Sequence, residues 1–142
     1  MDSLLTAKLQ AKARVLDTVI TLCDTCKRSG WDPVSQPLTD GEILADLVEA
    51  AAKGRLGIRT RRHSCLLGCD YACNIALQAP GKLTFVLGMF EPMHEAAQAI
   101  VDYACKHAES VNGYVPFREW PQGVKGHFRA RLPLYPPEEP SE

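Results

Sequence analysis

The sequence has no apolar run long enough to cross a membrane, and its first residues lack the basic flank, apolar block and cleavage site of a signal peptide. Its net charge of −1 gives it no general attraction for nucleic acid or for an anionic membrane surface. It shows no nucleophile–base pair, no carboxylate pair and no glycine-rich phosphate loop. These absences argue against an enzyme and against nucleic-acid or membrane partners, and we expect a cytoplasmic protein.

The length and composition fit one globular domain. The chain has 142 residues, of which 46% are apolar, so it is long enough to bury a core. We predict an N-terminal extension over residues 1–12, a folded domain over residues 13–133 and a disordered, proline-rich tail over residues 134–142.

The apolar pattern predicts a small mixed α/β sheet in the order β-α-β-β-β-α, with the last two strands forming a hairpin and two helices flanking the sheet. A short edge strand is expected near the C-terminus. The expected elements are a strand over residues 14–23, a helix after the Thr39–Glu42 capping box, a strand over residues 58–64, strands over 75–78 and 83–87 joined by a Pro80–Gly81 turn, a helix from Pro92, and the edge strand within residues 127–133.

Five of the six cysteines fall into two groups. Cys23 and Cys26 follow the first expected strand, and Cys65, Cys69 and Cys73 follow the second at four-residue intervals. A strand–helix–strand unit makes a parallel crossover, and parallel strands end at the same edge of a sheet. We therefore expect both groups to meet at one edge.

Several chemistries remain open for these thiols. Disulfides are rare in the reducing cytosol, whereas four thiolates suit zinc or an iron–sulfur cluster. The alternatives are a redox-active pair formed by Cys23 and Cys26, or small buried side chains with no further role. Cys105 is expected in the core of the second helix, while His94 and His107 on the same helix are expected to face water.

The segment "SCLLGCDYACNIALQAPGKLTFVLG", residues 64–88, resembles the second half of thioredoxin-like [2Fe-2S] ferredoxins, which include a small peripheral subunit of respiratory complex I. Cys65 and Cys69 match the two cysteines of the ferredoxin motif Cys-Leu-Gly-x-Cys in spacing, although Gly68 falls one place late. The ferredoxins space their first cysteine pair more widely than Cys23 and Cys26, and they usually have Gly or Pro in place of Cys73.

A closer similarity is to a small bacterial family catalogued as predicted metal-binding proteins of unknown function. That family combines C-x2-C, then C-x3-C-x3-C, then "ALQAPGK", and ends in a "VP-[WF]-R" segment like "YVPFREWP" here. The similarity covers about residues 15–133. Members tend to be encoded near cobalamin or cobalt-handling genes, which suggests a link to cobalt metabolism.

These resemblances imply a thioredoxin-like ferredoxin fold and a [2Fe-2S] cluster that transfers single electrons. The implied ligands are Cys23, Cys26, Cys65 and Cys69, with Cys73 as a spare or alternative ligand. The alternative is a zinc or cobalt protein, either a metal carrier or a structural site, that holds Zn²⁺ or Co²⁺ between four thiolates without redox activity.

An electron carrier needs a redox partner protein, and a homodimer is also compatible with the sequence. The basic residues nearest the cysteines in sequence are expected to surround the site and attract an acidic partner surface. The alternative is an ordinary solvated loop and strand face. The residues in question are Lys27, Arg28, Arg59, Arg61 and Arg62.

Overall fold

A computed structural model describes residues 17–134. The domain boundaries predicted at residues 12 and 13 lie outside this range, as does the tail from residue 135 onward. The described elements are β1 (Thr18–Cys23), α2 (Asp40–Ala52), β2 (Ile58–His63), η1 (Cys69–Tyr71), β3 (Ile75–Gln78), β4 (Thr84–Leu87), α3 (His94–Glu109), η2 (Phe117–Glu119), η3 (Gln122–Val124) and β5 (Phe128–Leu132).

The strands form one mixed sheet in the order β2-β1-β3-β4-β5. β1 pairs with β2 in parallel, and every other neighbouring pair is antiparallel. The predicted parallel crossover, the hairpin and the C-terminal edge strand are therefore confirmed, and the chain has a mixed α/β fold.

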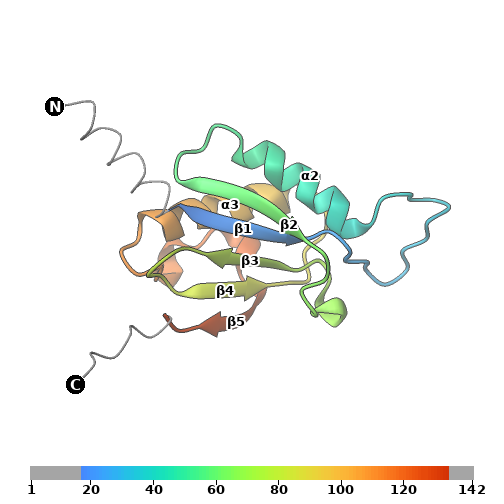
Figure 1. Cartoon of the computed structure of the whole chain (residues 1–142). Helices are drawn as coiled ribbons and strands as arrows, with labels where there is room; N and C mark the ends of the chain where they lie inside the picture. Colours follow the sequence, from blue (N-terminus) through green and yellow to red (C-terminus); the bar gives the residue numbers. More distant parts are fainter. Residues whose placement is uncertain (1–16, 135–142) are drawn as a thin grey trace, which may run out of the picture.

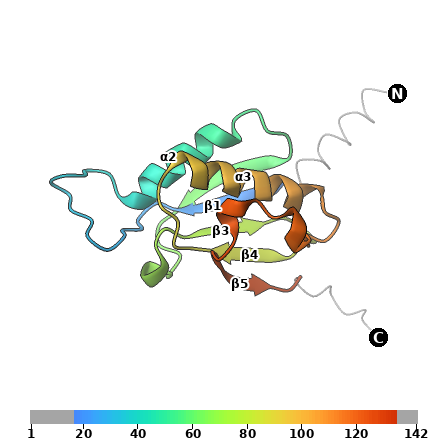
Figure 2. The same ribbon diagram turned by 180° about the vertical axis from the view of Figure 1, so that it is seen from behind.

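Both long helices cover the same face of the sheet, as the two opposite views in Figures 1 and 2 show. Strand residues alternate between faces, so Ile20 and Leu22 of β1 lie on the helix side, where they pair with Leu77 and Ile75 and are buried with them. The opposite face carries the intervening residues, such as Val19. Within the described residues, no helix covers this second face.

Local sequence signals explain where the elements begin and turn. The Thr39 side chain accepts a hydrogen bond from the backbone of Glu42, whose side chain in turn accepts one from Thr39 N–H, so the predicted capping box starts α2. The β3–β4 turn has Gly81 at φ +70° and closes with a 3.2 Å bond from Lys82 N–H to the Ala79 carbonyl. The second long helix begins at His94, slightly later than predicted from Pro92.

Two predictions about α3 side chains need correction. His107 was expected to face water but is fully buried, because its ring nitrogens lie 2.8 Å from Thr18 Oγ1 and 2.7 Å from the Leu83 carbonyl. Cys105 was expected in the core but is only partly buried and lies at the core's margin, where it accepts a hydrogen bond from Arg55. No helix in residues 17–134 is long and apolar enough to span a membrane.

Candidate metal centre

The topology brings both cysteine groups to one edge of the sheet, as predicted. Cys23 is the last residue of β1 and pairs in register with His63, the last residue of β2, which lies two positions before Cys65. β3 runs antiparallel to β1, so its start, which follows Cys73, lies at the same edge. In Figure 1 this is the edge at which the β1 arrowhead ends.

The loop from Cys23 to Arg28 is tied to the first turn of α2. A methyl group on Gly41 would lie only 2.1 Å from the Cys23 carbonyl oxygen, so this close approach requires glycine. Three hydrogen bonds join the two segments: Thr39 Oγ1 donates to the Asp24 carbonyl at 2.6 Å, Gly41 N–H to the Cys26 carbonyl at 2.9 Å, and Arg28 N–H to Asp40 Oδ2 at 2.6 Å.

Left-handed backbone conformations concentrate at this edge. Within residues 17–134, the non-glycine residues with positive φ are Cys65 at 58°, Leu67 at 60° and Met89 at 64°. Such conformations are costly for residues with side chains and cluster at binding and active sites. Their position here indicates that the loop after β2 is shaped for a purpose other than stability.

Cys23 and Cys26 form one hydrogen-bonded thiol pair. Burial raises the pKa of Cys23, but hydrogen bonds from Cys26, from the Leu66 backbone and from Thr25 outweigh it and lower the pKa below the ordinary value. Burial, reinforced by the hydrogen bond to Cys23, raises the pKa of Cys26 to about 11. In this pair Cys23 therefore ionises more readily than Cys26, and Cys26 is the donor of the hydrogen bond between them.

Cys65 and Cys69 form a second pair on the outer side of the first. The hydrogen bond to Cys65 raises the pKa of Cys69, which is exposed. The charge of Cys23 also contributes to the raised pKa of Cys69, so the two pairs are neighbours.

Cys73 lies inside this arrangement and is fully buried. Burial, followed by the charge of Cys26, raises the pKa of its thiol to about 12. All five cysteines therefore lie at the same edge: two as an inner pair, two as an outer pair and Cys73 buried beside Cys26.

Asn74 is a buried polar residue that connects the two cysteine loops, and the sequence analysis missed it. Its backbone N–H and its side-chain Nδ2 both lie 3.4 Å from Cys26 Sγ, and Nδ2 also donates to the Gly68 carbonyl at 2.6 Å. A methyl group on Gly68 or on Gly88 would lie within 3 Å of the Asn74 amide, so both glycines make room for it. The only signal in the sequence was its position directly after Cys73.

The thiols are paired but do not converge on one point. In the part of the chain that the structure describes, no group of three or more His, Cys, Asp or Glu side chains is arranged to hold a metal ion. The donor chemistry nevertheless fits a soft metal, because sulfur ligands and N–H donors to sulfur are already gathered at one edge.

A family model described as "Protein of unknown function (DUF1636)" matches residues 20–134, which include all five of these cysteines. The chain belongs to this family. No curated protein and no solved structure matches the chain.

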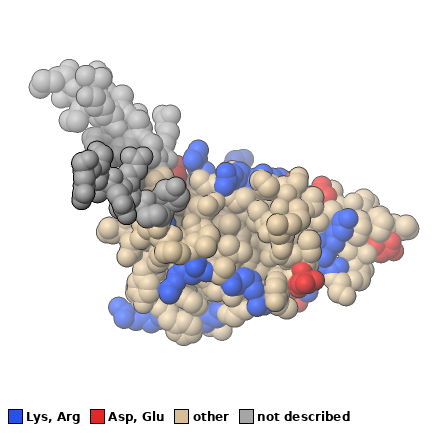
Figure 3. All heavy atoms as spheres, turned by 60° about the horizontal axis from the view of Figure 1, so that its bottom comes forward, with Lys and Arg blue, Asp and Glu red and all other residues tan. Residues whose placement is uncertain are grey.

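The structure does not form the expected basic rim around the cysteines of this DUF1636 member. Arg62 lies on the helix side and pairs with Asp46 at 2.6 Å and Glu49 at 2.7 Å, while Arg59 and Arg61 lie on the opposite face of the same strand. Hydrogen bonds to the two carboxylates raise the pKa of Arg62. On the face drawn in Figure 3, Lys and Arg side chains lie in separate groups.

Lys27 and Arg28 do remain beside the cysteines. They border a hollow of about 220 Å³ together with Cys69 and Met89. Arg28 lies 3.9 Å from Glu91, and both side chains are well exposed, so this ion pair contributes little. Exposed apolar side chains surround the same edge of the DUF1636 member, namely Leu67, Tyr71 and Met89.

Proposed function

We propose that this protein is a small cytoplasmic electron carrier with a thioredoxin-like ferredoxin fold and a [2Fe-2S] cluster bound by Cys23, Cys26, Cys65 and Cys69. The cluster would supply one-electron chemistry, and the chain would supply the ligands, the N–H donors and partial burial. We further propose that it is not an enzyme and that its partner is another redox protein.

The pairing of the thiols carries this proposal. Four cysteines lie at one sheet edge as two hydrogen-bonded pairs, one on each of two loops. A [2Fe-2S] cluster has two iron atoms, and each takes two thiolates, so two separate pairs suit it. A single tetrahedral Zn²⁺ would need all four sulfurs to converge on one point.

The backbone around the inner pair also suits an iron–sulfur centre. The Leu66 N–H donates to Cys23, and the Asn74 N–H and Nδ2 groups donate to Cys26 Sγ. Hydrogen bonds to sulfur stabilise its negative charge and tune the reduction potential of such centres. Cys65 has a left-handed backbone conformation and lies directly before Leu66. In this proposal its strained conformation serves to orient the Leu66 N–H toward Cys23.

The order of the elements supports the fold part of the proposal. A parallel β-α-β unit followed by an antiparallel hairpin and a second helix agrees with the element order expected from the ferredoxin resemblance. β5 adds an edge strand to that core.

The alternative is a carrier of Zn²⁺ or Co²⁺, which the exposure of Cys69 favours. A thiol at the surface beside a small hollow is accessible to a metal acceptor. Co²⁺ as the cargo fits the resemblance to proteins encoded near cobalt-handling genes.

Anaerobic purification distinguishes the two functions. The proposal expects a red-brown protein with iron and acid-labile sulfide in equal amounts, and a rhombic electron paramagnetic resonance signal after one-electron reduction. A colourless protein that contains stoichiometric zinc, or that takes up Co²⁺ in place of iron, would support the carrier and overturn the electron-transfer proposal.

Single Cys-to-Ser variants test the ligand set. Cys23→Ser, Cys26→Ser, Cys65→Ser and Cys69→Ser should each lose most of the iron, whereas Cys73→Ser and the control Cys105→Ser should retain it. Loss of iron in Cys73→Ser with retention in Cys26→Ser would show that the fifth thiol, rather than Cys26, is the ligand.

A further inference from the structure

A second candidate site lies at the end of the sheet opposite the cysteines. A groove of about 720 Å³ crosses the helix-free face there and is bordered by the start of β1, the arginines of β2, the β3–β4 turn and the end of β5. In register, Val19 lies between Arg59 and Gln78, and Thr84 lies opposite Leu132. This volume falls in the range of ~300–1,000 Å³ that is usual for small-molecule sites.

Arg61 is fixed over this face by two side-chain hydrogen bonds. Its Nε donates to Thr21 Oγ1 at 2.7 Å and its Nη2 to Gln78 Oε1 at 3.0 Å, so the guanidinium leans along the sheet toward the groove. Within residues 17–134 no carboxylate oxygen lies within 4.0 Å of it. Its orientation is therefore set by neutral partners, and its charge is not neutralised by them.

Arg59 supplies a second charge on the same face. It lies two positions before Arg61, which places the two side chains roughly 7 Å apart along the strand. Its contact with Asp17 Oδ2 is long at 3.8 Å, and 62% of its side chain is exposed. Such an ion pair is weak and can rearrange to admit an anion.

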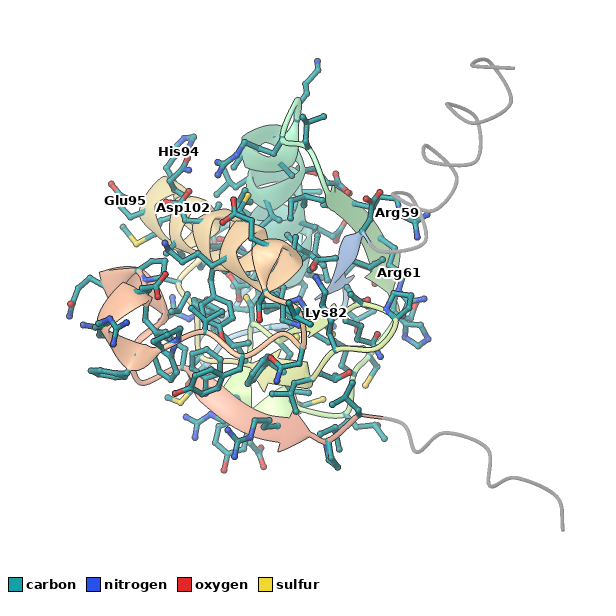
Figure 4. The ribbon with its side chains drawn as sticks, turned by 90° about the vertical axis from the view of Figure 1, so that its left-hand side faces the viewer. Arg59, Arg61, Lys82, His94, Glu95 and Asp102 are labelled. Atoms are coloured by element: carbon teal, nitrogen blue, oxygen red, sulfur yellow. The ribbon has the colours of Figure 1, made fainter. Side chains whose placement is uncertain are left out.

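Lys82 also borders the groove, and Figure 4, which labels all three residues, shows it nearer the middle of the molecule than the two arginines. It is buried, and its Nζ donates to the carbonyls of His107 and Ala108 at the C-terminal end of α3, at 3.0 Å and 2.5 Å. These carbonyls lie at the negative end of the α3 dipole and hold the ammonium, so Lys82 borders the groove without supplying its anion contact.

The remaining lining includes the polar side chains of Asp17, Gln78 and Thr84, together with an apolar wall. Val19, Pro80, Leu132 and Leu134 border the groove, and the last two are large, exposed side chains. A bare ion would leave this surface uncovered, whereas a ligand with an apolar body would cover it. The combination differs from a nucleic-acid surface, because the cations are few and, within residues 17–134, no aromatic side chain borders the groove.

We propose that this groove binds a small organic anion, a carboxylate or a phosphate ester, with its charged group at Arg59 and Arg61 and its apolar body against Val19 and Leu132. The site is independent of the cysteine edge, so it stands whether or not the chain carries an iron–sulfur cluster.

Amide shifts in a nitrogen-15 spectrum of the full-length protein test the proposal with four probes. Benzoate and phenyl phosphate carry an anion on an apolar ring, benzyl alcohol is the neutral counterpart, and inorganic phosphate lacks the ring. We expect benzoate or phenyl phosphate to shift the amides of Val19, Arg61 and Gln78 saturably, and about tenfold more tightly than either control probe. The tighter of the two identifies the anion as a carboxylate or a phosphate.

Variants locate the binding. Arg61→Gln should weaken the better probe about tenfold, which is the effect of losing one charge-assisted contact. Arg59→Gln provides a second variant if Arg61→Gln fails to fold. The matched control is Arg118→Gln, an exposed position on η2 outside the groove, which should bind as the wild type does.

Three results would overturn the proposal. The first is the absence of saturable shifts at ~10 mM of either ring-bearing anion. The second is equal affinity for one of the control probes. Equal affinity for benzyl alcohol would show that binding does not need the charge, and equal affinity for inorganic phosphate would show that it does not need the apolar wall. The third is equal weakening in Arg118→Gln, which would indicate a general charge effect.

Discussion

Asn74 shows how much of the cysteine edge depends on one side chain. Its amide contacts Cys26 Sγ in one loop and the Gly68 carbonyl in the other, so it holds the inner thiol pair against the loop that carries the outer pair. Gly68 lies six positions before it in sequence, but Cys26 is 48 positions away. Such a role becomes visible only when the chain is folded.

Replacing Asn74 with alanine should affect both stability and redox behaviour. The Gly68 carbonyl loses its partner, which costs about 1–3 kcal/mol of unfolding free energy. The sulfur of Cys26 loses one of two N–H donors, and the reduced, more negative centre is then less stabilised, so the reduction potential should fall. Chemical denaturation and redox titration measure the two effects.

Asn112→Ala is the matched control for that change, because Asn112 is exposed and lies in the loop after α3. It should leave the reduction potential unchanged and lower the stability less than Asn74→Ala does, because its side chain accepts hydrogen bonds only in an exposed loop. An Asn74→Ala protein with normal stability and an unchanged reduction potential would show that the Asn74 amide neither stabilises the two loops nor tunes the centre.

At the scale of single elements, the contact between α2 and the Cys23–Cys26 loop determines where the inner thiols lie. Gly41 stands at the point of closest approach, in the first turn of α2. The helix and the loop are already joined by hydrogen bonds on either side of it. A side chain at this position therefore forces the two segments apart.

Gly41→Ala should lower the free energy of unfolding by about 1–3 kcal/mol, because the added methyl group would overlap the Cys23 carbonyl. This loss is expected although alanine is the better helix former. Metal content should fall with it. Gly30→Ala is the control, since a methyl group there meets no atom within 4 Å and only its positive φ is strained. Normal metal content and stability in Gly41→Ala would contradict the close approach.

The elements themselves were largely predictable, because their signals are local. The capping box of α2, the Pro80–Gly81 turn and the β-rich runs each depend on residues a few positions apart, and all were located within a few residues. The meeting of the cysteines also followed from local reasoning, because parallel strands must end at one edge.

The errors came from side-chain direction and from distant partners. The arginines of β2 were grouped by their nearness in sequence, yet a strand alternates faces, so Arg61 and Arg62 point to opposite sides. That error was avoidable from the strand period. The burial of His107 was also signalled, because it lies seven positions after Ile100 on the apolar face of the helix, whereas its partners Thr18 and Leu83 could not be foreseen.

At the scale of the whole molecule, His107 joins the layers together. It sits on α3, contacts Thr18 at the start of β1 and Leu83 just before β4, and packs edge-on against Phe85. The charged group that faces it is Lys82, whose ammonium binds the carbonyl of His107 itself. His107 is therefore a buried, titratable group that joins α3 to the sheet at the end opposite the cysteines.

This connection predicts that stability depends on pH. Burial lowers the pKa of His107, and the nearby Lys82 acts in the same direction against a hydrogen bond to the Leu83 carbonyl. The folded state therefore binds its proton less readily than the unfolded state, whose histidine has an ordinary pKa of about 6.5. Stability is fully present above that value and falls as the pH drops below it, by at most about 1.4 kcal/mol per pH unit for one proton.

Urea denaturation of the wild type and of His107→Gln from about pH 8 to about pH 5 measures this contribution. The variant should be less stable at neutral pH, because it fits the Thr18 and Leu83 contacts less well, but its stability should fall less steeply below about pH 6.5. Acid effects on the thiol centre act on both proteins and cancel in the comparison of slopes. His94→Gln, on the same helix but exposed, is the control and should keep the wild-type slope. Parallel slopes for the wild type and His107→Gln would show that the buried ring takes up no proton in this range.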